Sequence, residues 1–327
     1  MARYTEIAWA DGTWNPVRGC TKISPGCTNC YAKKLSSRNP SVLGSWGPGG
    51  VRVVGGADYW RRPVQYAHAH LRAVERGEVP AEPYRLFTAS LADIFEDHPV
   101  VEGVRSRIWQ ETLPALDKLR LPDGRPALVL LALTKRAQIA RDWYDAHGCP
   151  ETVWPGITVE DQARADERIP IMVGLPRLWL SMEPLLGAVS LPDAHLGGLN
   201  WIIGGGESGP NARPMHPEWV RSLRDQCQAA SVPFFFKQWG EIAPWVNERH
   251  FTHGGAERHP HFWIDRNTGK SGAVWIVDSD GGWSNWTGDP PMEGNKVAPS
   301  VAILGHHGKS AAGRILDGRE WSEVPRG

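Results

Sequence analysis

Three of the five cysteines lie close together, in the segment Gly19-Cys20-Thr-Lys-Ile-Ser-Pro-Gly-Cys27-Thr-Asn-Cys30-Tyr31. Their spacing is C-x6-C-x2-C, and the Gly and Pro residues between them predict a tight loop whose backbone amides can face a metal or sulfide. The C-x2-C pair brings two thiolates together, as metal and cluster sites require. Three such cysteines fit three ligands of a four-iron cluster and leave one iron open for a ligand from outside the protein.

The same cysteines also fit a structural zinc site, a redox pair or free thiols. A closed zinc site needs a fourth ligand, which Cys149 or one of the twelve histidines would have to supply from a distant part of the chain. A disulfide scaffold is excluded, because five cysteines cannot all pair and most are not spread along the chain.

Polar side chains follow most of the short apolar runs at the point where each run ends. These residues are Ser90, Asp93, Thr134, Lys135, Arg136, Glu160, Ser181, Glu183, Glu207 and Lys237. If the runs are parallel strands of a barrel, all of these side chains converge on one mouth. A carboxylate at a strand end can accept hydrogen bonds from sugar hydroxyls or an amino group of a ligand, which favours Glu160, Glu183 and Glu207.

Structural roles remain open for the same residues. Asp93 can cap a helix, Lys135 can belong to a solvated helix face, and Glu183 can stabilise a turn before Pro184. The run Gly204–Gly206 can let the backbone approach a ligand closely, or it can form a tight turn.

The elements that must position these residues alternate between strands and helices. The apolar runs are typical of strands buried on both faces, and they cover residues 86–89, 127–133, 154–159, 178–182, 201–205 and 232–236. Helices are predicted between them, over residues 63–76, 99–119, 134–147, 161–168 and 217–230. No phosphate-binding glycine fingerprint follows any run. We therefore expect an α/β fold, a partial or near-complete (β/α) TIM-type barrel with parallel strands.

Composition changes near residue 240, beyond which Gly, Pro, Trp and His are frequent. This change predicts a barrel with an N-terminal cluster loop over residues 1–240, and an irregular C-terminal extension or lid over 241–327. Residues 308–324 are expected to form a short helix and tail. The 17 tryptophans are expected to serve packing first and stacking second, with Trp239 the best candidate for stacking.

The chain of 327 residues is neutral overall, with 36 basic and 36 acidic residues. Global disorder and a bulk electrostatic attraction to nucleic acid are therefore not expected. The first residues show no basic region followed by an apolar run, and no apolar stretch approaches membrane-spanning length, so we expect a cytoplasmic protein without a signal peptide or a membrane partner.

Motifs along nearly the whole chain resemble a phage and prophage three-cysteine protein family that is related to radical S-adenosylmethionine (SAM) enzymes. They comprise Trp14–Val17, Cys30–Ala32, Ser90–Phe95, Leu133–Arg136, Gly156–Glu160, Ser181–Gly187, Gly204–Gly209, Phe236–Gly240 and Gly313–Trp321. The first cysteine gap is six residues here, whereas radical SAM enzymes usually have C-x3-C-x2-C. The segment 200–207 nearly fits a superfamily pattern of adenine contact.

The resemblance implies a [4Fe–4S] cluster on Cys20, Cys27 and Cys30, with SAM bound to the fourth iron. An electron from an external donor would cleave SAM to a 5′-deoxyadenosyl radical, which abstracts hydrogen from a small-molecule, nucleotide or nucleic-acid substrate, including a base or modified DNA. The expected SAM contacts are Tyr31, Ser90, Asp93, Lys135, Glu160, Ser181, Glu183, Gly204, Gly205, Glu207 and Lys237.

Two other functional classes stay open at this point. One is a zinc-stabilised module that binds nucleic acid or protein without catalysis. The other is a redox or sensor protein that holds a cluster and performs no SAM chemistry.

Overall fold

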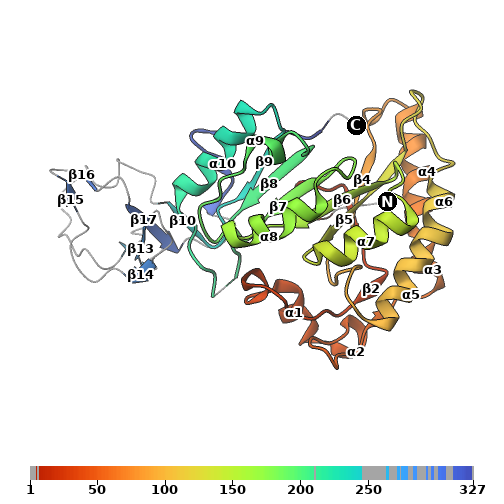
Figure 1. Cartoon of the computed structure of the whole chain (residues 1–327), viewed down its shortest axis with the longest axis horizontal. Coiled ribbons are helices and arrows are strands. Elements are labelled where there is room, and N and C mark those ends of the chain that lie inside the picture. Colours follow the sequence, from red (N-terminus) through yellow and green to blue (C-terminus); the bar gives the residue numbers. More distant parts are fainter. Residues whose placement is uncertain are drawn as a thin grey trace.

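The structure is a computed structural model that describes residues 5, 7–209, 211–244 and 312–325, together with the backbone of short strands between 263 and 306. Figure 1 shows a curved sheet with helices α7 and α8 along one of its faces and α4, α5 and α6 grouped beside it. This arrangement confirms the predicted class, a partial TIM-type barrel.

Seven parallel strands form the half-barrel, in the order β1-β4-β5-β6-β7-β8-β9. Each new strand is added to the same growing edge, as successive right-handed βαβ units require. The strands are β1 (Gly12–Trp14), β4 (Tyr84–Thr88), β5 (Leu128–Thr134), β6 (Val153–Thr158), β7 (Trp179–Met182), β8 (Trp201–Gly205) and β9 (Phe234–Gln238). A two-stranded ribbon, β2 (Val17–Arg18) with β3 (Val53–Val54), follows β1.

The predicted helices are present, with boundaries shifted by a few residues. The helices are α1 (Tyr31–Ser36), α2 (Pro40–Leu43), α3 (Ala57–Trp60), α4 (Arg62–Glu75), α5 (Pro99–Arg107), α6 (Leu113–Leu116), α7 (Ala137–His147), α8 (Gln162–Met172), α9 (Asp193–Leu196) and α10 (Pro217–Ala229). Between α5 and α6 lies a π-helical turn, η2 (Ile108–Thr112). None of the helices among the described residues has the length and apolar character needed to cross a membrane.

The two faces of the sheet bury different side chains. The face under the helices packs aliphatic residues such as Leu130, Leu180 and Ile202 against them. The opposite face carries an aromatic cluster made of Trp9, Phe87, Trp154, Trp179, Trp201 and Phe235. The cluster fills the concave side of the half-barrel with large side chains, so packing accounts for these four tryptophans. Trp239 is also buried, and its indole donates to the Ile315 carbonyl at 2.9 Å.

Gly156 makes room for this aromatic cluster. A Cβ atom at Gly156 would lie 2.4 Å from Cε2 of Trp179, and the Trp179 indole donates to the Trp154 carbonyl at 3.0 Å. The absence of a side chain in β6 therefore lets the indole of the next strand lie against the backbone.

The short helix expected at the start of residues 308–324 falls on residues of which the structure describes only Ala312, which is helical, and the tail is described from Gly313 onward. The chain forms a hairpin there, β18 (Ile315–Leu316) with β19 (Arg319–Glu320), and its turn holds Asp317 and Gly318 at positive φ. Asp-Gly is a strong hairpin signal because both residues tolerate these angles. Beyond the hairpin, the Phe236 amide donates to the Trp321 carbonyl at 2.9 Å, so this segment covers the outer edge of β9.

The extension, described only in part, contains short strands. Strands β10 (Ile242–Pro244), β17 (Val301–His306), β13 (Val274–Asp278) and β14 (Trp283–Asn285) form an antiparallel sheet. Two further pairs of short strands lie in the extension, namely β11 (Trp263–Ile264) with β12 (Ser271–Gly272) and β15 (Met292–Glu293) with β16 (Lys296–Val297). The expected lid role falls largely on residues outside the described part of the chain, and it stays a prediction.

Candidate functional site

A cavity of about 460 Å³ opens at the carboxyl ends of the barrel strands, above the aromatic cluster. Trp9 and Phe87 form part of its lining, and their rings are tilted toward each other with centroids 4.7 Å apart. Most of the sequence-predicted site residues line this one cavity, namely Cys20, Cys27, Cys30, Tyr31, Ser90, Asp93, Lys135, Ser181, Glu183, Glu207 and Lys237. Glu160, Gly204 and Gly205 are not among the lining residues.

The cysteine segment is built from two short turns. Cys27 ends a 3-10 helix, η1 (Pro25–Cys27), and Cys30 is the residue before the first turn of α1. All three thiols are free and partly buried. Within the described residues, no three His, Cys, Asp or Glu side chains are gathered around a single point that would hold one metal ion. The three thiols therefore line one cavity, but their sulfur atoms do not converge on a single metal position.

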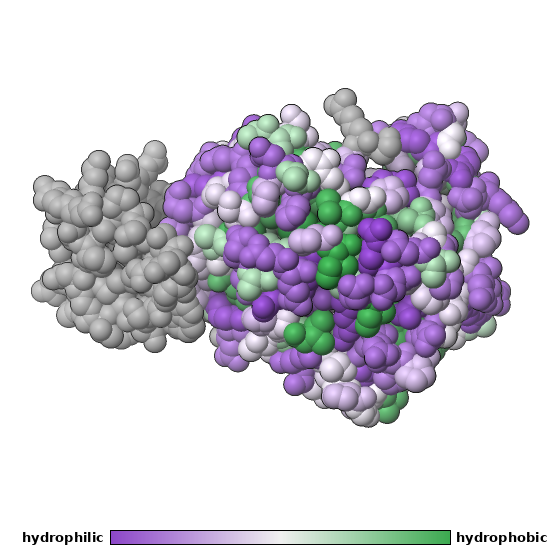
Figure 2. Space-filling view, in the orientation of Figure 1, coloured by the Kyte–Doolittle hydropathy of each residue, from purple (hydrophilic) through white to green (hydrophobic). Residues whose placement is uncertain are grey.

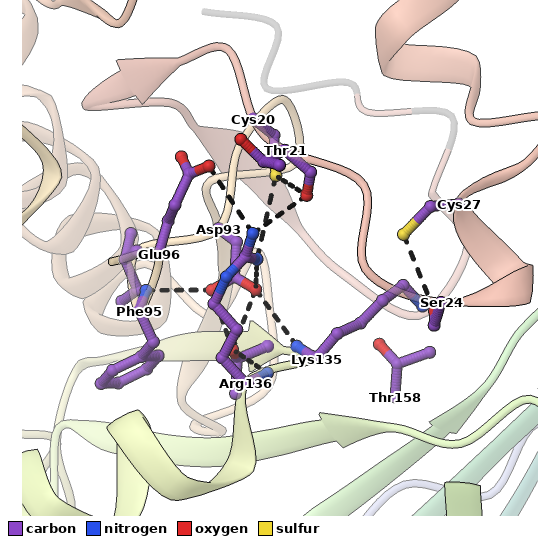
Figure 3. Close-up of polar contacts among 12 residues, drawn as sticks. Cys20, Thr21, Ser24, Cys27, Asp93, Phe95, Glu96, Lys135, Arg136 and Thr158 are labelled. Carbon is purple, nitrogen blue, oxygen red and sulfur yellow. Dashed lines mark hydrogen bonds and ion pairs between the residues drawn. The ribbon is translucent and has the colours of Figure 1, made fainter. Parts of the chain in front are cut away.

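Arg136 connects Cys20 to the end of β5. Its Nη1 lies 4.0 Å from Cys20 Sγ and 2.8 Å from Asp93 Oδ2, and its Nη2 donates to the Thr21 carbonyl at 2.9 Å (Figure 3). Burial, followed by the charge of Asp93, raises the pKa of the Cys20 thiol to about 12, although Arg136 opposes this shift. The free thiol is thus protonated at neutral pH, and a bound metal would have to displace its proton.

A buried ion pair supports the same segment from below. Arg52 and Glu96 meet at 2.7 Å, and both side chains are almost fully buried. Arg52 also donates to Thr21 Oγ1 at 2.9 Å and to the carbonyls of Ser45, Gly47 and Gly50. Because one guanidinium satisfies so many acceptors, the loop at 45–50 and the residues after Cys20 are held together.

Glu160 lies beneath the cysteine segment and is fully buried. Its carboxylate accepts from Ser24, from Lys135 Nζ at 2.8 Å and from Arg168 Nη1 at 2.8 Å. Burial alone would raise the pKa of Glu160, but the charges of Lys135 and Arg168 hold it below its ordinary value. A Cβ atom at Gly26 would lie 2.5 Å from this carboxylate, so the loop rests directly on Glu160.

Glu207 holds the cysteine segment from the end of β8. It accepts from Asn29 Nδ2 at 2.9 Å and from Arg213 at 2.6 Å, and Arg213 in turn donates to the Pro25 carbonyl at 3.0 Å. Burial raises the pKa of Glu207, yet the hydrogen bonds from Arg213 and Asn29 lower it overall. Two of the carboxylates expected to contact SAM, Glu160 and Glu207, therefore contact the cysteine segment in this structure.

Asp93 and Tyr31 fix the wall formed by the loop after β4. Asp93 accepts from the Thr134 hydroxyl, the Lys135 amide, Arg136 and the Phe95 amide. The Tyr31 hydroxyl donates to the Ser90 carbonyl at 2.7 Å, while the residue as a whole stays 56% exposed. These bonds connect the start of α1 to the end of β4.

Lys237 and Glu183 face each other across the ends of β9 and β7, with Nζ 3.0 Å from Oε1. Gly205 lies beside this pair, since a Cβ atom there would be 2.8 Å from Glu183 Oε1. Gly204 instead faces Leu223 and Phe234, away from the cavity. Gly206, which the sequence did not single out by itself, lines the cavity and passes close to the Trp239 carbonyl.

Several positioning residues were not predicted from the sequence. They are Ser24, Asn29, Arg52, Arg168 and Arg213, each bound to a predicted site residue or to the cysteine segment. Asn29 had a signal, because it stands inside the C-x2-C pair. Arg168 lies on a helix face, where a charged residue is ordinarily solvated, and Arg52 and Arg213 bind Thr21 and Pro25 at separations of 31 and 188 positions.

The donor set fits an iron–sulfur group. Three free thiols border one cavity, thiolates are the ligands such clusters prefer, and a guanidinium lies beside Cys20. Cys149 lies outside this cavity's lining, and Cys227 is fully buried at α10. Cys20, Cys27 and Cys30 are therefore the residues that would hold a cluster.

Comparison with known proteins gives one family and one solved structure. No curated protein matches the chain significantly. A structure of spore photoproduct lyase with bound AdoMet and dinucleoside spore photoproduct is similar at 11% identity and a TM-score of 0.38, over 78% of this chain and 65% of that one. The chain thus spans less than two thirds of that protein's length. The sequence also matches, over residues 4–325, the family described as "Protein of unknown function (DUF5131)". Because this match covers almost every residue, the chain belongs to the DUF5131 family.

Proposed function

We propose that this chain is a radical SAM enzyme, in which Cys20, Cys27 and Cys30 hold a [4Fe–4S] cluster and SAM binds in the adjoining cavity. One observation carries the proposal: three free cysteines from one short segment line the same 460 Å³ cavity as polar residues from the ends of six barrel strands. Active sites of parallel barrels lie at this end of the strands. The motif resemblance described above points to the same chemistry.

When bound, the cluster and SAM would supply a 5′-deoxyadenosyl radical that removes hydrogen from a substrate. The chain's own residues bind and orient. Ser181 and Glu183 offer a hydroxyl and a carboxylate to sugar hydroxyls or an amino group, and Lys237 offers a cation to a carboxylate. Trp9 and Phe87 give the cavity an apolar base, which excludes water from the reacting groups.

The substrate in this proposal is a small molecule, a nucleotide or a nucleic-acid base, including modified DNA. A cavity of about 460 Å³ lies within the ordinary range of roughly 300–1,000 Å³ for small-ligand sites. Tyr31, an exposed residue that lines the cavity, offers a ring on which a base can stack. An external electron donor completes the set of partners.

Anaerobic reconstitution tests the proposal directly. The purified chain is incubated with iron and sulfide, and its iron, sulfide and zinc contents are measured. It is then mixed with SAM and dithionite, and 5′-deoxyadenosine and methionine are quantified. We expect about four irons per chain and SAM-dependent formation of 5′-deoxyadenosine. A colourless chain that carries one zinc and forms no 5′-deoxyadenosine would overturn the proposal in favour of a zinc-stabilised binding module.

Matched cysteine variants sharpen this experiment. Cys27→Ala removes a thiol at the cavity and should abolish cluster assembly and 5′-deoxyadenosine formation. Cys149→Ala removes a partly buried thiol that does not line the cavity, and it should leave both unchanged. SAM affinity of the reconstituted wild type separates an enzyme from a cluster-bearing redox protein, because the latter would hold iron and bind no SAM.

A further inference from the structure

The N-terminal part of the chain has a charge distribution unlike the rest. Residues 12–57 contain no Asp or Glu, although the whole chain has 36 basic and 36 acidic residues. The same stretch contains six cations: Arg18, Lys22, Lys33, Lys34, Arg38 and Arg52. Only Arg52 is neutralised by a buried partner, Glu96. A neutral protein therefore carries a locally positive segment, and this segment also holds the three cysteines.

Four of these cations are available to a partner. Lys22, Lys33, Lys34 and Arg38 are exposed, and none of them forms an ion pair with the residues that the structure describes. Lys22 Nζ donates to the Thr28 carbonyl, which holds its charge over the cysteine loop. Unpaired surface cations on one segment create a positive local potential that attracts an acidic partner.

Exposed apolar side chains lie in the same stretch. Of the nine large hydrophobic residues exposed in the described part of the chain, six fall between residues 23 and 54: Ile23, Tyr31, Leu35, Val42, Val51 and Val54. Helix α1 contacts α2, and α2 contacts β3, so the residues belong to one packed unit. Figure 2 shows apolar patches among hydrophilic residues over the region where Figure 1 shows α1 and α2. Exposed apolar groups rimmed by charge are typical of protein interaction sites.

We propose that this basic apolar surface, made of residues 22–54, docks an acidic redox protein that delivers single electrons to the iron–sulfur site. The inference rests on the proposed function and adds the place and the chemistry of the donor. Docking here brings the donor to the chain segment that carries Cys20, Cys27 and Cys30. In each encounter the donor is oxidised by one electron and the group held by these cysteines is reduced by one.

The exposed aliphatic side chains favour a protein over a nucleic acid as the occupant. Phosphate backbones are contacted by cations and hydrogen-bond donors, and Leu35, Val42, Val51 and Val54 offer neither. The core of a protein interface, by contrast, is built from such apolar groups inside a charged rim. The segment therefore fits a partner with an acidic rim around an apolar centre.

The test measures binding and electron transfer separately, with a purified acidic flavodoxin as the probe. Lys33→Glu/Lys34→Glu reverses two exposed charges on α1, outside the cavity. We expect this variant to bind oxidised flavodoxin about tenfold more weakly at low salt, and to be reduced by flavodoxin hydroquinone correspondingly more slowly. Reduction by dithionite, a small reductant that needs no docking surface, should stay at the wild-type rate.

A matched control reverses the same number of charges elsewhere. Arg72→Glu/Lys118→Glu changes two exposed cations outside the segment and should leave flavodoxin binding unchanged. Equal weakening by both double variants, or no binding by the wild type, overturns the docking proposal. So does a loss of duplex-DNA binding in the α1 variant with flavodoxin binding intact. Flavodoxin binding is also measured on the chain without a cluster. A chain that assembles no cluster would refute the proposed function, and its flavodoxin binding would still test the docking surface.

Discussion

Asn29, the residue just before Cys30 inside the C-x2-C pair, donates a hydrogen bond of 2.9 Å to the Glu207 carboxylate at the end of β8. A second carboxylate, Glu160 at the end of β6, accepts from Ser24 on the other side of Cys27. The two contacts fasten the cysteine segment to two strands of the barrel. Strand-end carboxylates here position the cysteine segment, which is a role distinct from direct ligand contact.

Replacing Glu207 should loosen the cysteine segment without unfolding the barrel. Glu207→Ala removes the acceptor for Asn29 and leaves Arg213 without its carboxylate partner. We expect the free energy of unfolding to fall by about 1–3 kcal/mol, because a partly buried charge loses its hydrogen bonds. Iron bound per chain after anaerobic reconstitution should fall several-fold, as measured by metal analysis.

The exposed pair Arg221–Glu218 provides the comparison for this variant, since the Glu218 side chain is 56% exposed. Glu218→Ala should change stability by no more than about 1 kcal/mol and leave iron uptake unchanged. Wild-type iron uptake by Glu207→Ala would contradict the positioning role of Glu207.

Glu160→Gln should destabilise the protein more strongly. The side chain is fully buried between Lys135 and Arg168, and Arg168 is itself almost completely buried. Removing the charge leaves a buried guanidinium unpaired, which costs about 3–5 kcal/mol. Urea unfolding measures the loss of unfolding free energy. The control is Glu111→Gln, which removes the charge of an exposed partner of Arg107 and should cost about 1 kcal/mol or less. Equal stability of the two variants would refute this prediction.

The contribution of the Glu160 carboxylate to the free energy of unfolding should be lost as the pH falls. Lys135 and Arg168 hold the pKa of Glu160 below its ordinary value of 4.5, against the opposing effect of burial. A carboxyl group with a lowered pKa stabilises the folded state fully above its ordinary pKa, and this contribution is lost as the pH falls through the lowered value. The difference in unfolding free energy between wild type and Glu160→Gln should therefore be constant from about pH 7 to 5 and shrink below about pH 4. A difference that grows on acidification would contradict it.

The barrel was predictable because its strands are continuous apolar runs. Residues 201–205 were predicted with the exact bounds of β8, the run at 127–133 lies one residue before β5 at both ends, and the run at 178–182 begins one residue before β7. Strand β1 was missed as an apolar run because it spans only Gly12–Trp14 and gains its pairing from β4. The hairpin at 315–320 was missed although its Asp317-Gly318 turn was visible in the sequence.

Most of the residues that line the cavity could be predicted from the sequence. Strand-end residues such as Asp93, Glu183 and Lys237 border one cavity because parallel strands end at one edge. Their partners were not predictable, because they depend on distances between distant segments. The bond between Asn29 and Glu207 joins residues 178 positions apart, and nothing local in either segment specifies it. That Glu160 and Glu207 contact SAM stays a prediction.

Gly206 should be the least replaceable glycine of the Gly204–Gly206 run. A Cβ atom at Gly206 would lie 1.8 Å from the backbone oxygen of Trp239, so Gly206→Ala forces the ends of β8 and β9 apart. At Gly204 the nearest atom to a new Cβ, Leu223 Cδ2, is 3.4 Å away, which is an ordinary packing distance. We expect Gly206→Ala to cost about 3 kcal/mol or more and Gly204→Ala less than about 1.5 kcal/mol. Thermal and urea unfolding of both variants give the comparison, and SAM affinity of the reconstituted proteins should fall with Gly206→Ala alone. If Gly204→Ala destabilised the protein more than Gly206→Ala, the close approach of Gly206 to the Trp239 carbonyl would not be the reason that this run needs glycine.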